Sequence, residues 1–384
     1  MLASEAARSQ TVGPNLVTTP ITGNQDVTVV GSTQLRPPAG SVAVNPSGSA
    51  TVTFDPGAAP TPGPISVETQ NARAIVITGG TQVEINPFGS PFLTTITTTG
   101  TDAYAINVVS GNHTQVLNNV AISTSGTTAD AIRIENPNNI INATGVTVTT
   151  TGAGASALAL LSGGGSLANF TNSTLTSEAG PVIRVEMGDL PGKNINLTDT
   201  SVTAGSGDGR WLYVTRLSTP TNVTASHSTL TGAAITDPGS ISNVVLQGDT
   251  TWHLTGDSNV ANLTNDASTI DFAPPVGGAF KTLTTVNYVG VGGTIGLNTF
   301  LGTDNSPSDK LVINGGSGSG STTLLVRNTG GPGAETVSNG ILVVQAISGG
   351  TTTPTAFSLA GGSRHRRRVR LLPVQGRRHA RNAR

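Results

Sequence analysis

The sequence predicts an all-β protein, a right-handed parallel β-helix with about 25–29 residues in each coil. The composition favours strands and turns, because charged residues make up only 11% of the 384 residues while Gly (49), Thr, Ser, Asn and Val are abundant. No window of 11 or more residues has apolar positions at helical spacing. Two strand-like motifs recur at nearly constant intervals, which is typical of a solenoid.

The first motif is a small or apolar residue followed by alternating apolar positions. Its starts are separated by 31, 26, 26, 25 and 29 residues. The copies lie at residues 74–77 (AIVI), 105–108 (AINV), 131–134 (AIRI), 157–160 (ALAL), 182–185 (VIRV) and 211–214 (WLYV).

The second motif lies between copies of the first, at steps of 26, 27, 27 and 28 residues. Its central apolar residues are Ile122, Val148, Leu175, Val202 and Leu230. Each repeat therefore holds at least two short strands separated by turns. An antiparallel sandwich or a row of Ig-like modules also has short strands with regular turns, but does not repeat one strand motif at this interval.

Residues 1–65 are expected to form an irregular N-terminal segment or cap, because the Pro- and Gly-rich segments PPAG and PGAAPTPGP interrupt the strand-like sequence. Residues 66–245 are the regular coils, with Val, Ile, Leu and Ala facing inward and Thr, Ser and Asn facing outward in ladders.

The chain has no Cys, which excludes disulfides and thiolate metal sites. No signal peptide is visible at the start and no apolar run approaches a membrane helix.

From residue 246 the sequence changes, and residues 246–362 form a third region. The ordered motifs are WxLTGDS at 252–258, STIDF at 268–272, NSPSDKL at 305–311 with Asp309-Lys310-Leu311 at its centre, NTGG at 328–331, a strand at 340–346, and AFSL at 356–359. This region closely resembles the autochaperone at the C-terminal end of pertactin-like autotransporter passengers.

The resemblance implies a bacterial passenger secreted through a C-terminal outer-membrane β-barrel that the same polypeptide normally supplies. The autochaperone end would emerge first and template the remaining coils. It also implies a place on the bacterial cell surface or outside the cell, and a role in adhesion or surface structure toward a host or cell-surface ligand. The expected fold residues of the autochaperone are Trp252, Leu254, Gly256, Asp257, Phe272, Asp309 and Leu311.

Residues 363–384 form a basic tail that contrasts with the rest of the chain. Nine of the 20 Lys and Arg residues lie in residues 364–384, which hold no acidic residue, so this stretch carries +9 and residues 1–363 carry 11 − 21 = −10. In the family, the sequence continues into the β-barrel at this point. The Arg-rich sequence found here instead is typical of GC-rich DNA translated in the wrong reading frame. We therefore expect a disordered frameshift product. The alternative is a tail that binds polyanions.

Two aspartates are candidates for carboxylate chemistry. Asp102 and Asp130 lie 28 residues apart, in equivalent turns before AINV and AIRI, and Asp208 lies in an equivalent turn further on. Stacked carboxylates could serve a polysaccharide-degrading enzyme or a weak cation site. No cluster of Lys or Arg is expected beside them, so solvated turn residues are the other interpretation. The alternative function is thus a secreted β-helix enzyme acting on acidic polysaccharide.

Other catalytic signatures are weak. Gly256-Asp257-Ser258 is followed by Asn259 rather than the Gly of a serine-protease loop, so it is expected to be a coil turn. His113, His227 and His253 do not cluster and are expected at the surface. The sequence therefore predicts no catalytic, cofactor or metal site, no nucleic-acid partner, and a monomer that is not an enzyme.

Overall fold

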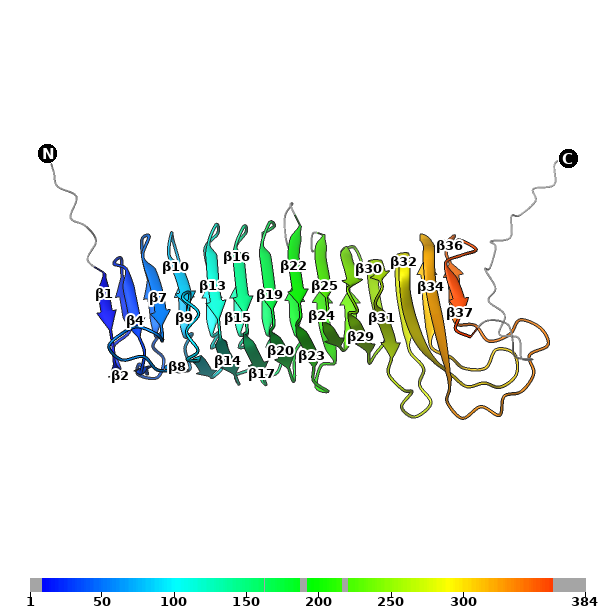
Figure 1. Cartoon of the computed structure of the whole chain (residues 1–384), viewed down its shortest axis with the longest axis horizontal. Coiled ribbons are helices and arrows are strands. Elements are labelled where there is room, and N and C mark those ends of the chain that lie inside the picture. Colours follow the sequence, from blue (N-terminus) through cyan, green and yellow to red (C-terminus); the bar gives the residue numbers. More distant parts are fainter. Residues whose placement is uncertain (1–8, 162, 187–191, 216–219, 362–384) are drawn as a thin grey trace. The chain divides into compact units, whose positions relative to one another are not determined.

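The computed structural model describes residues 9–161, 163–186, 192–215 and 220–361, and the basic tail predicted for 363–384 lies outside these ranges. The chain divides into two compact units, one ending at Ser242 and one starting at Asn243. Every named element is a β-strand (Figure 1). Across the described ranges, no helix is long and apolar enough to cross a membrane.

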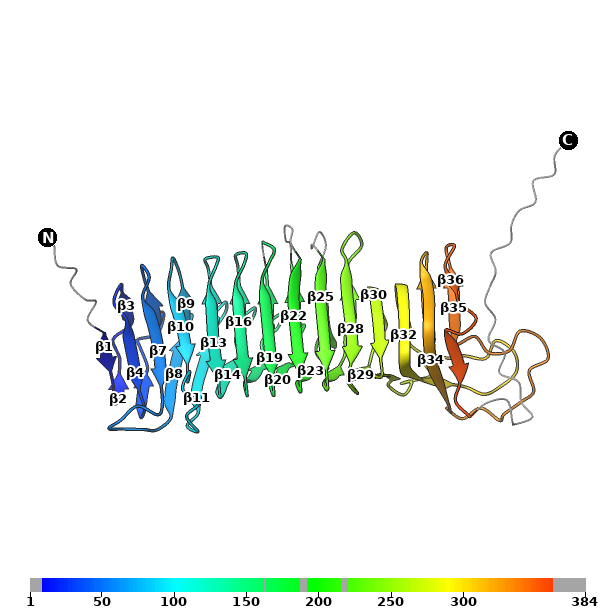
Figure 2. The ribbon, with the colours of Figure 1, turned by 45° about the horizontal axis from the view of Figure 1, so that its top comes forward.

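In the first unit each full coil contributes three short strands, and all strand pairs between coils are parallel (Figure 2). One strand of each coil joins a separate sheet. Its members are β3 (Ile21–Gly23), β6 (Val44–Pro46), β9 (Ile75–Ile77), β12 (Ile106–Val108), β15 (Ile132–Ile134), β18 (Leu158–Leu160), β21 (Ile183–Val185), β24 (Arg210–Val214) and β27 (Ala233–Thr236).

The other two strands of each coil form two further parallel series. The first series is β1 (Gln10–Val12), β4 (Val27–Val30), β7 (Thr51–Asp55), β10 (Gln82–Ile85), β13 (Thr114–Asn118), β16 (Ile140–Thr144), β19 (Leu167–Thr171), β22 (Lys193–Thr198) and β25 (Thr221–Ser226). The second is β2 (Asn15–Val17), β5 (Thr33–Leu35), β8 (Ile65–Gln70), β11 (Thr94–Thr99), β14 (Val120–Thr124), β17 (Thr147–Thr150), β20 (Thr174–Ser177), β23 (Ser201–Ala204) and β26 (Thr229–Thr231).

The two sequence motifs occupy equivalent positions in successive coils. In the first motif, Ile106 pairs with Ile75 on one side and with Ile132 on the other. In the second motif, Val148 pairs with Ile122 and Leu175. These apolar residues are buried and fill the inside of the coils. The prediction of an all-β parallel solenoid is confirmed.

Residues 10–65, expected to be irregular or a cap, contain strands β1 to β7 and the start of β8. They join the same parallel pairings as later coils, since Val52 pairs with Val27 and with Val83. The sequence hides this regularity because nine residues, 56–64, are inserted between β7 and β8. The insertion shifts the spacing of the motifs without breaking the coil.

Outward-facing asparagines form the predicted ladders between coils. In the first unit, Asn169 Nδ2 donates to Asn142 Oδ1 at 2.8 Å, and Asn196 Nδ2 donates to Asn169 Oδ1 at 2.9 Å. Such like-on-like amide bonds connect coils whose backbones already pair, and they favour one register.

The second unit has longer strands. It contains β28 (Ser242–Gln247), which begins at the unit boundary, β29 (Thr251–Leu254), β30 (Ser258–Asp266), β31 (Thr269–Phe272), β32 (Thr282–Thr299), β33 (Lys310–Asn314), β34 (Ser317–Asn328), β35 (Val344–Ile347), β36 (Thr351–Thr352) and β37 (Phe357–Leu359).

The named strands of the second unit also pair in parallel, and β32 and β34, with 18 and 12 residues, run beside each other. Two isolated bridges, Val276 with Ala279 and Thr299 with Ser308, are antiparallel. Tyr288 is fully buried and stacks on Phe357 with ring centroids 5.4 Å apart. This aromatic pair brings the last strand, β37, onto the core of the unit.

Candidate functional site

The two candidate aspartates lie in equivalent turns before β12 and β15. Asp102 has a φ of 53° in its turn. A buried hydroxyl holds each turn, since Thr98 Oγ1 donates to the Ala103 carbonyl and Thr124 Oγ1 donates to the Ala129 carbonyl. The two aspartates nevertheless lie two positions apart in these turns. Asp102 matches Thr128, which has a φ of 54°, and Asp130 matches Tyr104, so the predicted stacking of the two carboxylates is wrong.

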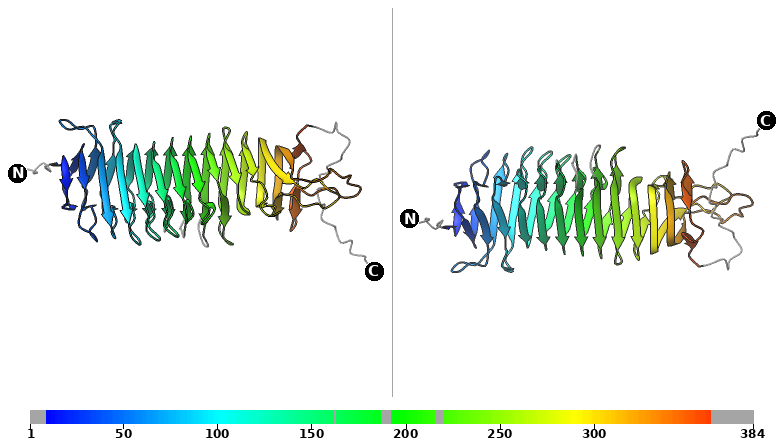
Figure 3. Two further views of the ribbon diagram at one scale, coloured as in Figure 1. Left: turned by 90° about the horizontal axis from the view of Figure 1, so that it is seen from below. Right: turned by 90° about the horizontal axis from the view of Figure 1, so that it is seen from above.

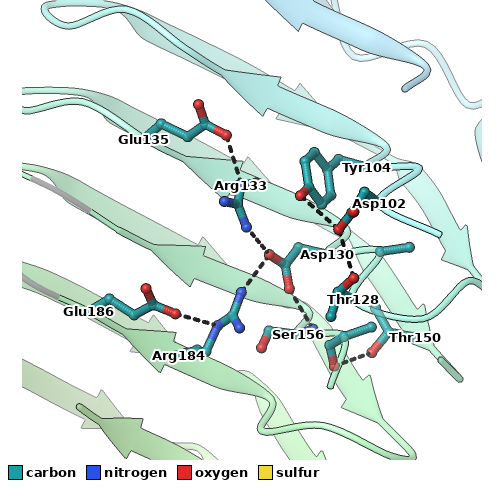
Figure 4. A network of polar contacts seen from close by, with 12 residues as sticks. Asp102, Tyr104, Thr128, Asp130, Arg133, Glu135, Thr150, Ser156, Arg184 and Glu186 are labelled. Atoms are coloured by element: carbon teal, nitrogen blue, oxygen red, sulfur yellow. Dashed lines mark hydrogen bonds and ion pairs between the residues drawn. The ribbon is translucent and has the colours of Figure 1, made fainter. Parts of the chain in front are cut away.

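Asp130 is fully buried and bound by two arginines (Figure 4). Its Oδ2 lies 2.9 Å from Arg133 Nη1 and 2.7 Å from Arg184 Nη2, and its Oδ1 accepts the N–H of Ser156 at 2.9 Å. Two predictions were therefore wrong for this residue. It is not a solvated turn residue, and basic side chains do lie beside it.

The arginines come from the outward middle positions of two strands in the nine-stranded sheet. Arg133 pairs with Ala159 of β18, which in turn pairs with Arg184 of β21. Because the Ala159 side chain is small, Arg184 can reach past it to Asp130, which lies two coils earlier. The repetition of Arg at one position of AIRI and VIRV was the sequence signal for this contact.

Further charged and aromatic groups extend the network across the sheet. Arg133 Nε bonds to Glu135 Oε1 at 2.8 Å, and Arg184 Nε lies 3.4 Å from Glu186 Oε1. The guanidinium of Arg133 also lies over the Tyr104 ring, 4.5 Å from its centroid, and that of Arg73 lies 5.2 Å from it. We call Arg73, Tyr104, Asp130, Arg133 and Arg184 the arginine face.

The two aspartates have pKa values shifted in opposite directions. Burial raises the pKa of Asp130, and the nearby Arg184, the Ser156 N–H and Arg133 only partly offset this effect. A hydrogen bond from the Thr128 hydroxyl, together with one from Tyr104, lowers the pKa of Asp102. Both oxygens of Asp130 are engaged within the protein. The geometry thus suits a clamp between coils better than a carboxylate pair open to a substrate.

Three of the expected autochaperone residues lie together in the core of the second unit. Trp252 and Leu254 of β29 are fully buried, and Leu254 pairs with Phe272 of β31, which is also fully buried. In the WxL motif the two apolar side chains thus face inward, and the residue between them, His253, faces outward with 46% of its side chain exposed.

Asp309 is a buried carboxylate with three donors. Its Oδ1 accepts the N–H of Lys281 at 2.7 Å, and its Oδ2 accepts the N–H and the Nδ2 of Asn298, each at 2.8 Å. It thereby connects the residues before β33 to both ends of β32. This placement gives a physical reason for the DKL motif.

The remaining expected residues shape turns and core. Asp257 Oδ1 accepts the N–H of Thr282 at 2.7 Å, and the Gly256 carbonyl accepts the Ser258 hydroxyl at 3.0 Å. The GDS sequence is therefore a coil turn, as predicted. Leu311 is fully buried and pairs with Leu283 and Val344.

The histidines lie apart from one another. His227 is an exposed turn residue with φ of 50°. His113 is only 5% exposed, so its expected surface position was wrong, and burial lowers its pKa. Within the described ranges, no group of three or more His, Cys, Asp or Glu side chains could hold a metal ion.

Comparison with known protein families gives a match in the second unit. Residues 258–364 match the family described as Autochaperone Domain Type 1. The match includes Phe272, Asp309 and Leu311 and begins after Trp252, Leu254, Gly256 and Asp257.

Two similar proteins carry autotransporter names. The chain is 32% identical over 145 residues to the autotransporter adhesin/invasin TibA of Escherichia coli O78:H11, covering 37% of this chain and 14% of TibA. It is 35% identical over 142 residues to the autotransporter CRAC of Citrobacter rodentium, covering 35% of this chain and 8% of CRAC. The chain therefore spans only a small part of the length of these relatives.

Proposed function

We propose that this chain, an autotransporter passenger with an autochaperone region, serves adhesion or surface structure at the bacterial cell surface without catalysing a reaction. The observation that carries the proposal is the second unit, in which the autochaperone match coincides with a packed set of parallel strands. Support for adhesion comes from TibA, which is named an adhesin/invasin.

The proposed partners are a host or cell-surface ligand and an outer-membrane β-barrel through which the passenger is translocated. In this mechanism the second unit folds first outside the cell and presents strand edges on which preceding strands can pair. Directional pairing of this kind reduces the loop-closure cost of each later strand, because its partner is already in place.

Translocation can be tested by fusing the chain between a signal peptide and an autotransporter β-barrel and expressing it in E. coli. Protease added to intact cells should then cleave the passenger, and surface antibody should label it. The Asp309→Asn variant should reach the surface in smaller amounts, because its second unit folds less readily. Asp199→Asn, an exposed turn residue in the first unit, is the control.

Adhesion is tested with the same cells. Cells that display the passenger should adhere to epithelial monolayers more than cells that display the barrel alone. Equal adherence at equal display would contradict the adhesive part of the proposal, whereas absence of the passenger from the surface would contradict the secretion part.

A further inference from the structure

Two neighbouring coils of the first unit carry long loops where the other coils have short turns. Nine residues, 56–64, separate β7 from β8, and eight, 86–93, separate β10 from β11. The same turn is only residue 119 between β13 and β14, and two residues between the corresponding strands of the following coils. Loops are seen projecting from the sides of the blue N-terminal coils (Figure 3). In solenoids, insertions that share one face are often binding elements.

The two loops lie against each other and are fixed by the protein. A Cβ on Gly57 would come within 3.1 Å of the Ser90 Cβ, so the loops approach closely there. Asn86 Oδ1 accepts the Ser90 N–H and Asn86 Nδ2 donates to the Ser90 carbonyl, both at 2.7 Å. From the next coil, Asn119 Nδ2 donates to the Phe92 carbonyl at 3.2 Å. A site made by these loops is therefore held in shape before any ligand arrives.

Between the loops is an open pocket of about 400 Å³, which we call the loop pocket. Its apolar lining includes Phe88, Phe92, Pro62 and Pro91. Phe88 is 76% exposed and Phe92 is 38% exposed, whereas Phe54, Phe170 and Phe272 are fully buried. In a chain with only 3% aromatic residues, two exposed rings in one pocket indicate a surface that meets another molecule.

Asp55 gives the loop pocket a negative charge. Its Oδ1 accepts the Gly57 N–H at 3.0 Å, and no ion pair of the described residues includes this carboxylate. No Lys or Arg is among the residues that line the pocket. A purely apolar occupant would cover the carboxylate without supplying a counter-charge, which is unfavourable.

A sugar is also a poor fit, because few polar side chains are available to its hydroxyl groups. Apart from Asp55, the lining offers the Ser90 hydroxyl, whose oxygen is 3.3 Å from the Phe92 N–H. An organic cation requires fewer polar contacts than a sugar, since aromatic faces attract it and one carboxylate balances its charge. Pockets of this volume hold small ligands of that size.

We propose that the loop pocket binds an alkylated ammonium group, such as the trimethylammonium of choline or of a methylated lysine side chain. Phe88 and Phe92 supply aromatic surface and Asp55 supplies the counter-charge. The inference goes beyond the proposed adhesion, which does not require this ligand. Because the pocket lies in the first unit, its variants should still reach the cell surface in the display assay.

The test is titration of the purified full chain with choline chloride, followed by calorimetry or by amide NMR shifts. We expect saturable binding, and Phe88→Ala and Asp55→Asn should each weaken it by about fivefold or more. The controls are Phe300→Ala, which removes a 38% exposed ring in the second unit, and Asp199→Asn. Both controls should bind choline as the wild type does. Circular dichroism verifies that each variant is folded.

A neutral ligand of the same shape as choline shows how much of the affinity depends on the positive charge. 3,3-Dimethylbutan-1-ol, the uncharged analogue of choline, should bind at least about fivefold more weakly. Titration with phosphocholine and with Nε-trimethyl-lysine identifies the source, and tighter binding of either one supports the proposal. Absence of saturable binding by all three trimethylammonium compounds, equal binding of the neutral analogue, or equal losses in the control variants would overturn it.

Discussion

Asp102 and Asp130 show at the scale of single residues how one repeat gives two carboxylates different surroundings. They occupy equivalent turns, yet Asp102 is exposed and accepts bonds from Thr128 and Tyr104, while Asp130 is buried against Arg133 and Arg184. Part of the difference arises within the turns, because Asp102 takes the position with positive φ that Thr128 takes in the next coil. Asp130 lies two positions further on, where the preceding coil has the buried Tyr104.

The first prediction concerns the pH dependence of stability. Burial raises the pKa of Asp130 in the folded chain above its pKa in the unfolded chain. Protonation of Asp130 therefore favours folding fully at pH values below the unfolded pKa, and this stabilisation is lost as pH rises through the folded pKa. Urea unfolding should show the wild type gaining stability relative to Asp130→Asn as pH falls from 7 toward 4. Relative to Asp102→Asn, the wild type should instead lose stability as pH falls below about 4, the ordinary pKa of an aspartate, since the folded pKa of Asp102 lies below it. A difference that is independent of pH would contradict the assignment.

Lys193 is a second buried charge in the first unit. It is 1% exposed, and its Nζ donates to the carbonyls of Leu160, Leu161 and Glu186. Burial lowers the pKa of Lys193 to about 8, although the carboxylate of Glu186 opposes the change. The ammonium is therefore a cost to folding at neutral pH.

The second prediction follows from this shift. Between pH 8 and 10.5 the unfolded chain keeps the Lys193 proton while the folded chain releases it, so stability should rise with pH in this window. Relative to Lys193→Met, the wild type should gain up to about 3 kcal/mol in free energy of unfolding. Parallel curves for the two proteins across this range would show that the Lys193 pKa is not lowered.

At the scale of elements, Asp309 links the two ends of the long strand β32. Its three donors are the N–H groups of Lys281 and Asn298 and the amide of Asn298, all near the strand termini. Lys281 Nζ also donates to the Ala273 carbonyl at 2.7 Å. Backbone bonds join the same segments, since the Asp309 N–H donates to the Asn298 carbonyl and the Lys310 N–H donates to the Lys281 carbonyl, each at 2.9 Å. The side-chain contacts therefore reinforce a closure that the backbone also makes.

The third prediction is that Asp309→Asn destabilises the second unit by about 2 kcal/mol, because an amide NH₂ would face a backbone donor inside the protein. Asp249→Asn is the matched control, since Asp249 is exposed with φ of 62° and Asn suits that conformation. Thermal unfolding of both variants measures the difference. Equal stability of the two would show that Asp309 does not hold β32.

The strand elements were largely predictable from the sequence, whereas contacts between distant side chains were not. Inward columns such as Ile75, Ile106 and Ile132 follow from the repeat, since stacked coils need apolar residues at one register. Arg184 and Asp130 are 54 residues apart, with a whole coil between them, so no local pattern joins them. The loop pocket was missed because its insertions looked like irregular sequence.

At the scale of the whole chain, the two units differ in how they can start to fold. The second unit has strands of up to 18 residues, stacked aromatic rings and a buried carboxylate that links strand ends. Most strands of the first unit have three to six residues and depend on neighbouring coils for their pairing. In repeat proteins folding proceeds from a stable nucleus to neighbouring units, and the second unit has the features of that nucleus.

Pulsed hydrogen exchange during refolding of the full chain, read by mass spectrometry, tests this order most directly. The account predicts that amides in residues 243–361 become protected before those in residues 9–242, and that Asp309→Asn delays both. Protection of the first unit before the second, or refolding of the first unit at an unchanged rate in Asp309→Asn, would contradict an autochaperone role for the second unit.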